Sequence, residues 1–460
     1  MNMNYPGKHR GLARIFWTWD HCTNWSLNQA GNQNCGSGNA YTKHPELFLQ
    51  DYKRMVDWCA ANRIDAIGIV GLLRDRHGGL AIARDLCAYA REKGIFVYII
   101  AGLYAYGGVY YEGNHKYCLD RFLEKNPECA ARDEHGKIYR FPFYSPAGGT
   151  TSNTCGCPSS PLMKEYILES LDWLFRAIPE LGGIQMEVGD IGTCKCPKCL
   201  ERKNKNEKSG SISFESMIRI YPDAAKTVLS VSPESWVICE TYHHFMPYQI
   251  DEGAFGCGVS EESLKKLTAL PEKCFLQWVC DRPIRENAWD ESVCISPALK
   301  NYRHIMRAHF GTYWSKHTRA ALEIEDIRKQ CRLSYYAGLH GVSLFGESSP
   351  FHPGTEFNYL AMVYFSENPM ATTEDFADAV MAERLGGKGQ AEKFLEFASA
   401  YKQPDRVPEI QKEIVRILGT LSDYEQIRRW QYLASFLNSF YWESRLPNYR
   451  KGEIIRTSDV

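Results

Sequence analysis

Residues 66–102, the stretch that decides the fold, read AIGIVGLLRDRHGGLAIARDLCAYAREKGIFVYIIAG. The apolar runs Ala66–Gly71 and Phe96–Gly102 have the length and composition of buried strands. Between them, Leu80–Lys93 is amphipathic with the spacing of a helix. A strand, a helix and a second strand in this order predict two parallel strands joined by a crossover helix.

The same alternation continues through the first two thirds of the chain, where Ser296–His309 is read as one of the helices. Eight parallel strands are the number that closes a (β/α)8 barrel, the TIM barrel, and this is the fold we predict. An open doubly wound sheet is the alternative, but no Gly-x-Gly-x-x-Gly follows the first strand, so its nucleotide-binding form has little support. The expected strands are Ala13–Trp19, Ala66–Gly71, Phe96–Gly102, Gly183–Val188, Trp236–Thr241, Cys274–Val279, Phe310–Trp314 and Gly341–Gly346.

The pattern changes after Gly346, where only helical periodicity remains. We therefore expect a catalytic barrel over residues 1–355 and a C-terminal helical subdomain over 356–460. The longest irregular stretch, Tyr106–Pro161, follows the third predicted strand. Loops of this length in compact domains are usually functional, and its glycine, tyrosine and proline content suits a wall around a site.

The composition excludes several classes of protein. The 54 Lys and Arg residues nearly balance 55 Asp and Glu residues, so the chain lacks the charge that nucleic acids or acidic membranes attract. It contains no uninterrupted 18-residue apolar run of the kind that spans a membrane. The first ten residues contain no apolar signal segment, and the 17 cysteines, spread along the chain, fit reduced thiols better than a disulfide framework. We expect a cytoplasmic protein without nucleic-acid or membrane partners.

Acidic and aromatic side chains recur at the ends of the predicted strands. In a barrel of this kind the active site lies at the carboxyl ends of the strands. Carboxylates are costly to bury unless they are paired or used. Aromatic faces beside carboxylates suit a sugar, because the ring packs on the aromatic group while its hydroxyls bond to acids and amides. The pattern predicts a glycosidase, which needs two carboxyl groups flanking the bond that it cleaves.

Glu187 is the first choice for the general acid, because it closes an apolar strand at the expected face of the barrel. Asp190 is expected to orient it or to contact a hydroxyl. Glu240 is the next candidate, as base, nucleophile or polariser of an intermediate. Glu347 and Asp281 are the alternatives for that second role. The sequence does not fix the distance between these groups, so retention and inversion stay open.

Substrate contacts are expected from the remaining polar and aromatic residues at the strand ends. Of Trp17 and Trp19, we expect only one to face the site. The competing interpretation is that the acids bond to loop backbone or pair with arginine; Arg282, for example, either binds a uronic acid carboxylate or pairs with Asp281. The candidate substrate-binding residues are Trp19, Asp20, His21, Tyr104, Tyr106, Tyr242, His244, Trp278, Asp281, Arg282 and Trp314.

The densest group of cysteines lies shortly after the fourth predicted strand. Cys194, Cys196 and Cys199 place three thiols on one short loop, a spacing that suits a structural zinc ion. The fourth ligand is expected from Cys157, with Cys155 as the alternative. The competing interpretation is that these are reduced thiols that serve as small apolar side chains.

Two segments resemble a group of barrel glycoside hydrolases. Gly183–Cys199, with its acid- and glycine-containing strand end and Cys-x-Cys-x-x-Cys loop, resembles the fourth-strand motif of relatives of family 20 hexosaminidases, family 67 α-glucuronidases and family 163 N-acetylglucosaminidases. Asn358–Pro369 resembles the helix that leads into their helical tail. The resemblance implies an N-acetylhexosamine, uronic acid or related sugar as the substrate, with Glu187 as the acid and without a catalytic cofactor. A pocket closed by the long loop Tyr106–Pro161 would suit exo action on a terminal sugar. Family 20 enzymes have adjacent Asp and Glu at this strand, whereas here Glu187 precedes Asp190 by three positions.

Two other functions stay open. A non-catalytic carbohydrate-binding barrel would present the same aromatic and acidic residues. A metal-dependent hydrolase would use His243, His244 and Asp281 as ligands, although adjacent residues on a strand point to opposite faces. The sequence leaves the sugar, the linkage and the oligomeric state open.

Overall fold

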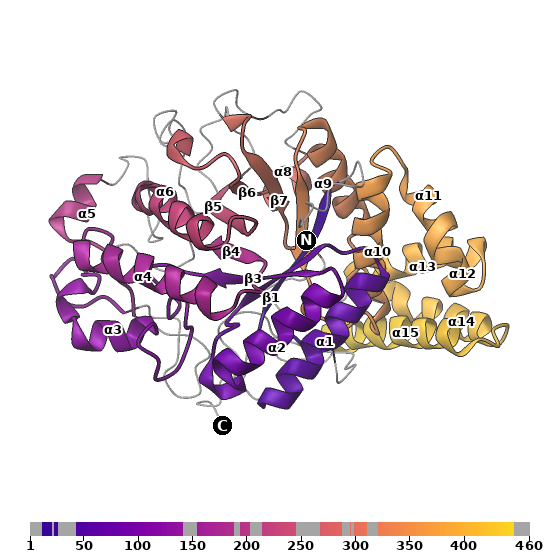
Figure 1. Ribbon diagram of the computed structural model, residues 1–460. Coiled ribbons are helices and arrows are strands. Elements are labelled where there is room, and N and C mark those ends of the chain that lie inside the picture. The colour runs from indigo at the N-terminus through magenta and orange to yellow at the C-terminus, as the bar shows by residue number, and fades with distance from the viewer. Residues whose placement is uncertain are drawn as a thin grey trace.

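The computed structural model describes residues 12–20, 23–25, 43–140, 154–187, 194–202, 214–244, 267–287, 295, 299–310 and 321–445. Within this part of the chain, eight parallel strands form a closed barrel in which each strand pairs with the next along the chain and β8 pairs with β1 (Figure 1). The predicted (β/α)8 barrel with a C-terminal helical region is confirmed. The strands are β1 Ala13–Trp19, β2 Ala66–Val70, β3 Phe96–Ala101, β4 Gly183–Met186, β5 Trp236–His244, β6 Phe275–Val279, β7 Arg303–Arg307 and β8 Gly341–Phe345.

Helices surround the strands, and the longer ones bury an apolar face against the barrel or a neighbouring helix. The first of them, α1, starts with a proline in its first turn, where the missing N–H is not needed, and buries Phe48, Tyr52, Met55 and Cys59 along one side. The helices around the barrel are α1 Pro45–Ala61, α2 Gly79–Glu92, α3 Leu119–Lys125, α4 Pro161–Ala177, α5 Pro197–Arg202, α6 Phe214–Val231, α8 Asp281–Arg285 and α9 Ile324–Tyr336.

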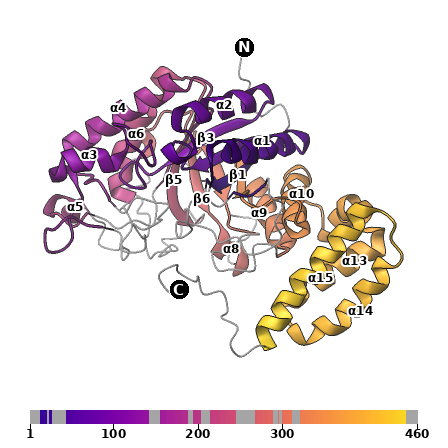
Figure 2. The ribbon, with the colours of Figure 1, turned by 90° about the horizontal axis from the view of Figure 1, so that it is seen from below.

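The C-terminal helices lie to one side of the barrel, with α13, α14 and α15 projecting away from it (Figure 2). The first of them, α10, packs against α9, β1 and β8 and also against α15. Because α10 begins at Pro353, it spans the predicted division at residues 355 and 356, which stays a prediction. These helices are α10 Pro353–Glu367, α11 Thr373–Phe376, α12 Ala382–Leu385, α13 Lys388–Ala398, α14 Val407–Leu418 and α15 Tyr424–Arg445, with a π-helical turn at Ala377–Met381.

Among the described helices, none combines the length and the apolar character that a membrane crossing requires. Every cysteine that the structure describes is a free thiol.

The prediction for the seventh strand was wrong. β7 is Arg303–Arg307, which lies inside the predicted helix Ser296–His309, whereas Phe310–Trp314 was the expected strand. The sequence does not show this strand as an apolar run, because it contains polar side chains that are buried against partners on other strands. On the outer face, His304 Nδ1 accepts a hydrogen bond from Trp278 Nε1 at 3.0 Å.

Charged and polar side chains fill the middle of the barrel. Arg307 on β7 donates to Glu240 on β5, and its guanidinium lies 4.4 Å from the centre of the Trp17 ring on β1. These strands are not neighbours, so the contacts run through the barrel interior. Gln277 on β6 also donates to Glu240, at 3.3 Å. Because both Arg307 and Glu240 are buried, each charge depends on the other.

The register identifies which other side chains face the interior. Gln185 on β4 pairs in register with Ile238, two residues before Glu240, so Gln185 and then Glu187 lie on the inner side. Trp17 and Trp19 are also two residues apart, and their rings meet edge to face at 5.8 Å. The expectation that only one of them faces the interior was wrong, because residues two apart on a strand share a face.

The expectation that Trp278 binds substrate was also wrong, because its side chain faces outward. It follows the inward-facing Gln277 and therefore points outward, where its indole bonds to His304 under the surrounding helices. Trp278 is not placed to contact a substrate at the mouth of the barrel.

The Arg307–Glu240 pair leads to a first prediction. Changing Arg307→Met leaves a buried, uncompensated carboxylate and should lower the free energy of unfolding by about 3–5 kcal/mol. Adding Glu240→Gln to that variant should recover most of the loss, because neither position then carries a charge that lacks its partner. Urea denaturation measures both changes.

The matched control is Arg176→Met, which removes an exposed arginine that pairs with Asp172 at 2.8 Å on α4. Exposed pairs of this kind contribute about 1 kcal/mol or less. An Arg307→Met protein as stable as the control would contradict the view that this pair supports the barrel.

Candidate active site

Glu187 is the first residue after β4 and lies on the inner side of the barrel. Its backbone N–H donates to the carbonyl of Ala101 on β3 at 3.0 Å, so the neighbouring strand holds the base of the side chain. Its side chain is 4% exposed. Residues 188–193 lie outside the described part, and with them Asp190.

An aromatic corner formed by Trp17, Trp19 and Tyr106 lies at the carboxyl end of β1. The rings of Trp19 and Tyr106 meet edge to face at 5.9 Å. Tyr106 has a φ of +51°, a left-handed conformation that side chains rarely adopt. The turn around it requires glycine, because a Cβ on Gly107 would lie 1.9 Å from the carbonyl oxygen of Tyr111. The loop after β3 therefore fixes Tyr106 against Trp19.

The buried Tyr104 belongs to the same turn, and its carbonyl accepts a hydrogen bond from the N–H of Gly156 at 2.7 Å. The far end of the long loop after β3 is in this way tied back to the end of that strand.

Glu347 follows β8, on the side of the barrel opposite β4. It is two residues beyond the inward-facing Phe345, whose ring lies 4.6 Å from that of Trp17. Its Oε1 accepts a hydrogen bond from the backbone N–H of Trp19 at 3.0 Å. Glu347 is buried and belongs to the same end of the barrel as Glu187 and the aromatic corner.

Asp20, expected to bind sugar hydroxyls, pairs with Arg74 at 2.7 Å, and both side chains are fully buried. Arg74 also bonds to Glu112 and lies 4.4 Å from the centre of the Tyr111 ring. Burial acts to lower the pKa of Arg74, but the interactions with Asp20, Tyr111 and Glu112 together outweigh it and the pKa rises. The structure thus places Asp20 in an ion pair with the loop after β2, and Arg74 in turn contacts the loop after β3; pairing with arginine is the competing interpretation of these acids.

Arg307 and His309 were missed by the sequence analysis because the seventh strand was placed too late. The backbone N–H of His309 donates to Asp281 at 2.7 Å, and its ring Nδ1 bonds to the same carboxylate at 2.9 Å. Arg307 donates to the other ring nitrogen at 3.2 Å. A continuous chain of hydrogen bonds therefore joins Asp281 to Glu240. The sequence contained one indication of this strand: Arg303, Ile305, Arg307 and His309 occupy every second position, so they would share one face of a strand.

Some expected residues are only partly described. Tyr242 and His244 belong to β5, and Arg282 to α8, but their side chains lie outside the description. His21 and Trp314 lie outside the described residues altogether.

The sulfur atoms of four cysteines gather within 4.8 Å of one another, and this group can hold a metal ion. It comprises Cys194, Cys196 and Cys199, the three thiols that the spacing predicted, and Cys157, the expected fourth ligand. Cys155, the alternative fourth ligand, is buried but is not part of the group.

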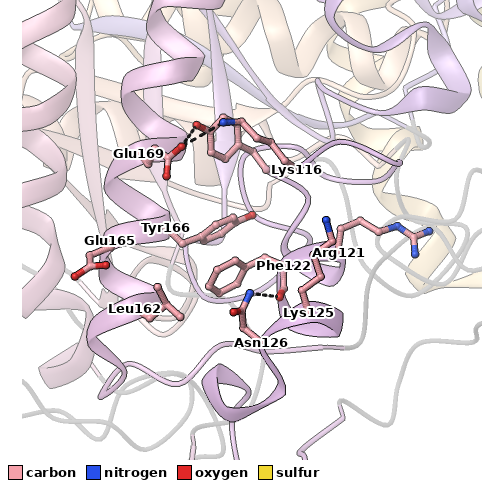
Figure 3. Close-up of a pocket in the computed structure, with 10 residues that line it drawn as sticks. Lys116, Arg121, Phe122, Lys125, Asn126, Leu162, Glu165, Tyr166 and Glu169 are labelled. Carbon is pink, nitrogen blue, oxygen red and sulfur yellow. Dashed lines mark hydrogen bonds and ion pairs between the residues drawn. The ribbon is translucent and has the colours of Figure 1, made fainter.

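A pocket of about 270 Å³ lies between α3 and α4, on the outer side of the barrel (Figure 3). Phe122 and Tyr166 stack at 4.1 Å in its wall, and Glu169 accepts hydrogen bonds from Lys116 and Tyr117. None of the predicted site residues lines it. The carboxyl end of the barrel therefore stays the candidate active site.

Comparison with known proteins gives likeness in structure but not in sequence. No family model and no curated protein matches this chain. A glycoside hydrolase family 138 enzyme that targets pectin rhamnogalacturonan II matches with a TM-score of 0.51 and 10% identity, over 94% of this chain and 57% of that one. A β-N-acetylhexosaminidase matches with a TM-score of 0.44 and 11% identity, over 82% and 76% of the two chains.

An inactive variant of the family 20 exo-β-N-acetylglucosaminidase from Vibrio harveyi matches with a TM-score of 0.41 and 12% identity, over 78% and 54%. The chain thus spans a little more than half the length of the family 138 enzyme. At these identities the likeness shows the barrel fold alone.

The contact between Asp281 and His309 predicts a pH dependence. Burial acts to raise the pKa of Asp281, but the interactions with His309, including hydrogen bonds from its ring and its backbone N–H, and the positive charge of Arg285 together outweigh burial and lower the pKa below the usual value near 3.8. A carboxyl whose pKa is lower in the folded state stabilises the protein above its unfolded pKa, and the stabilisation is lost as the pH falls through the folded value. Asp281→Asn should therefore lower the Tm at pH 7, and the difference from the unmodified protein should shrink below about pH 4.

Thermal unfolding at pH 7, 5, 4 and 3 measures this difference. The control is Asp85→Asn, which changes an exposed aspartate on α2. A Tm difference for Asp281→Asn that is the same at every pH would contradict the prediction.

Proposed function

We propose that this protein is a glycoside hydrolase that uses carboxylate acid–base catalysis on a terminal sugar. The observation that carries the proposal is the position of Glu187, on the inner side at the end of β4, where Glu347 and the aromatic corner of Trp17, Trp19 and Tyr106 also lie. Sugar sites combine these two elements, because the C–H face of the ring packs on aromatic side chains while carboxyl groups act on the bond.

Glu187 is proposed as the general acid. A protonated carboxyl group donates its proton to the glycosidic oxygen as the bond breaks, which requires a side chain held in a fixed position near the substrate. The hydrogen bond from its N–H to Ala101 supplies a rigid base for this side chain. The proposal agrees with the role that the resemblance of the fourth-strand motif implies.

Glu347 is proposed as the second carboxyl group. β8 and β4 lie four strands apart in the eight-stranded barrel, so groups at their ends face each other across its mouth. Glu240, the earlier candidate, is bonded to Arg307 and Gln277 in the interior, and we assign it a structural role. Asp281 is engaged by His309, and we assign it the role of holding that histidine.

The substrate is proposed to be a glycoside with a terminal N-acetylhexosamine, uronic acid or related sugar. The aromatic corner supports a sugar substrate, and the resemblance of the fourth-strand motif supports this range of sugars. The family 138 enzyme, which shares the fold, targets a pectin polysaccharide. The proposed chemistry needs no catalytic cofactor, because the carboxyl groups supply both proton transfer and charge.

A second candidate function is carbohydrate binding without turnover. It is favoured by the arginine pairing of Asp20 and Glu240, which leaves fewer acids for catalysis. Turnover of a glycoside distinguishes the two functions.

The first experiment is a screen of aryl glycosides that includes hexosaminides, uronides and neutral sugars. Turnover of at least one is expected. For that substrate, Glu187→Gln should lower kcat by at least about 100-fold, the scale of acid catalysis. The loss should be much smaller for a dinitrophenyl glycoside, whose leaving group departs without a proton. This dependence on the leaving group separates an acid from a residue that only supports the fold.

The matched control is Glu165→Gln on α4, which changes a glutamate in the wall of the outer pocket and should leave kcat unchanged. Near-full activity of Glu187→Gln would remove the acid assignment. Sugar binding without turnover of any glycoside would favour the non-catalytic function.

A further inference from the structure

The four-cysteine group of Cys157, Cys194, Cys196 and Cys199 is not used by the proposed catalysis. We propose that it is a structural zinc site that fastens the long loop after β3 to the segment after β4. The proposal rests on the arrangement of these thiols and is independent of the hydrolase activity.

The distances between the sulfur atoms fit a tetrahedral ion. Cys157 Sγ lies 3.5 Å from Cys194 Sγ and 3.8 Å from the sulfur atoms of both Cys196 and Cys199. Four sulfur atoms at the usual zinc–sulfur distance of 2.3 Å from a common centre are about 3.8 Å from one another. A disulfide would bring two of them to about 2.05 Å, so no pair is bonded covalently. The four sulfur atoms are therefore spaced as ligands around one central ion and not as two disulfide bonds.

Nearby donors favour the thiolate form that zinc requires. The backbone N–H of Arg132 donates to Cys194 Sγ at 3.3 Å, and the hydroxyl of Ser159 lies 2.9 Å from Cys199 Sγ. Binding of Zn²⁺ by all four residues releases four protons to solvent and leaves a centre with a charge of −2.

The ligand set identifies both the metal and its role. Four thiolates are soft ligands, which bind zinc in preference to magnesium or calcium. Four protein ligands also complete a tetrahedral zinc centre, so no position remains for a reactive water molecule. A closed centre of this kind is structural.

The two segments that the ion would join lie next to the candidate active site. Cys157 follows Gly156, whose N–H bonds to Tyr104 at the end of β3, and its own N–H bonds to the carbonyl of Cys129. On the other side, the N–H of Lys195 bonds to the carbonyl of Arg132 at 2.7 Å. The side chain of Lys195 also pairs with Glu134 at 2.7 Å, so the two segments are already in contact around the thiols. A bound ion would add four metal–sulfur bonds to these contacts.

Metal analysis of the full-length protein, purified without added zinc, tests the proposal. About one equivalent of zinc per chain is expected, and less than a tenth of an equivalent of any metal would overturn it. Iron in place of zinc would overturn the assignment of the metal. After exchange, Co²⁺ should give the absorption of a tetrahedral tetrathiolate centre, which an octahedral spectrum would contradict.

Variants identify the ligands. Cys157→Ser and Cys194→Ser should lose at least nine tenths of the bound zinc, whereas Cys155→Ser, two residues from a ligand and equally buried, should retain it. Full zinc content in Cys157→Ser would overturn the ligand assignment. If the serine variants do not fold, a mercurial reagent titrated into the unmodified protein decides the question. It should release one zinc ion as four thiols react, and release unrelated to thiol modification would contradict the site.

Discussion

The buried pair of Arg307 and Glu240 is the interaction on which the rest of the barrel depends. A closed barrel of eight strands must fill its interior with side chains, and here they include the ion pair of Arg307 and Glu240. Charges without water are tolerated only when each is paired and hydrogen-bonded. Gln277 and the Trp17 ring complete the surroundings of the pair, and His309 extends it to Asp281. One electrostatic requirement therefore fixes the relative positions of β5, β6 and β7 and, through Trp17, of β1.

Most of the fold could be predicted from the sequence because most strands are apolar runs between amphipathic helices. Ala66–Val70 and Phe96–Ala101 contain no charged residue, and their burial is evident. Arg303–Arg307 is different, because three of its five residues are basic in type and their partners, Trp278 and Glu240, are distant in sequence. A pattern of hydrophobicity cannot reveal a strand whose polar groups are satisfied by residues on other strands.

The candidate site could likewise be predicted where the signal is local in the sequence, and not where it depends on distant partners. Position at a strand end made Glu187 and Glu347 candidates, and the spacing of Cys194, Cys196 and Cys199 predicted three of the four clustered thiols, because these signals are local. The fourth thiol, Cys157 or Cys155, was left open. Asp20 follows β1, and the sequence analysis also placed Glu240 at a strand end, although β5 continues to His244; arginines hold both of them. Arg74 lies 54 residues from Asp20, and no local pattern announces such a partner. Contacts between residues distant in sequence therefore determine which carboxyl groups can take part in catalysis.

The helix α10 has a consequence for how this architecture can be divided. Its Asn358 accepts a hydrogen bond from the N–H of Glu323 and donates to the carbonyl of Ala321, so it satisfies the backbone just before α9. Its Glu356 forms two hydrogen bonds of 2.7 Å with Arg429 on α15. A single helix thus serves both the barrel and the C-terminal helices. A truncation that separated the two parts at residue 355 would strip the barrel of its own covering, and any exchange of the tail between proteins would have to carry α10 along with it.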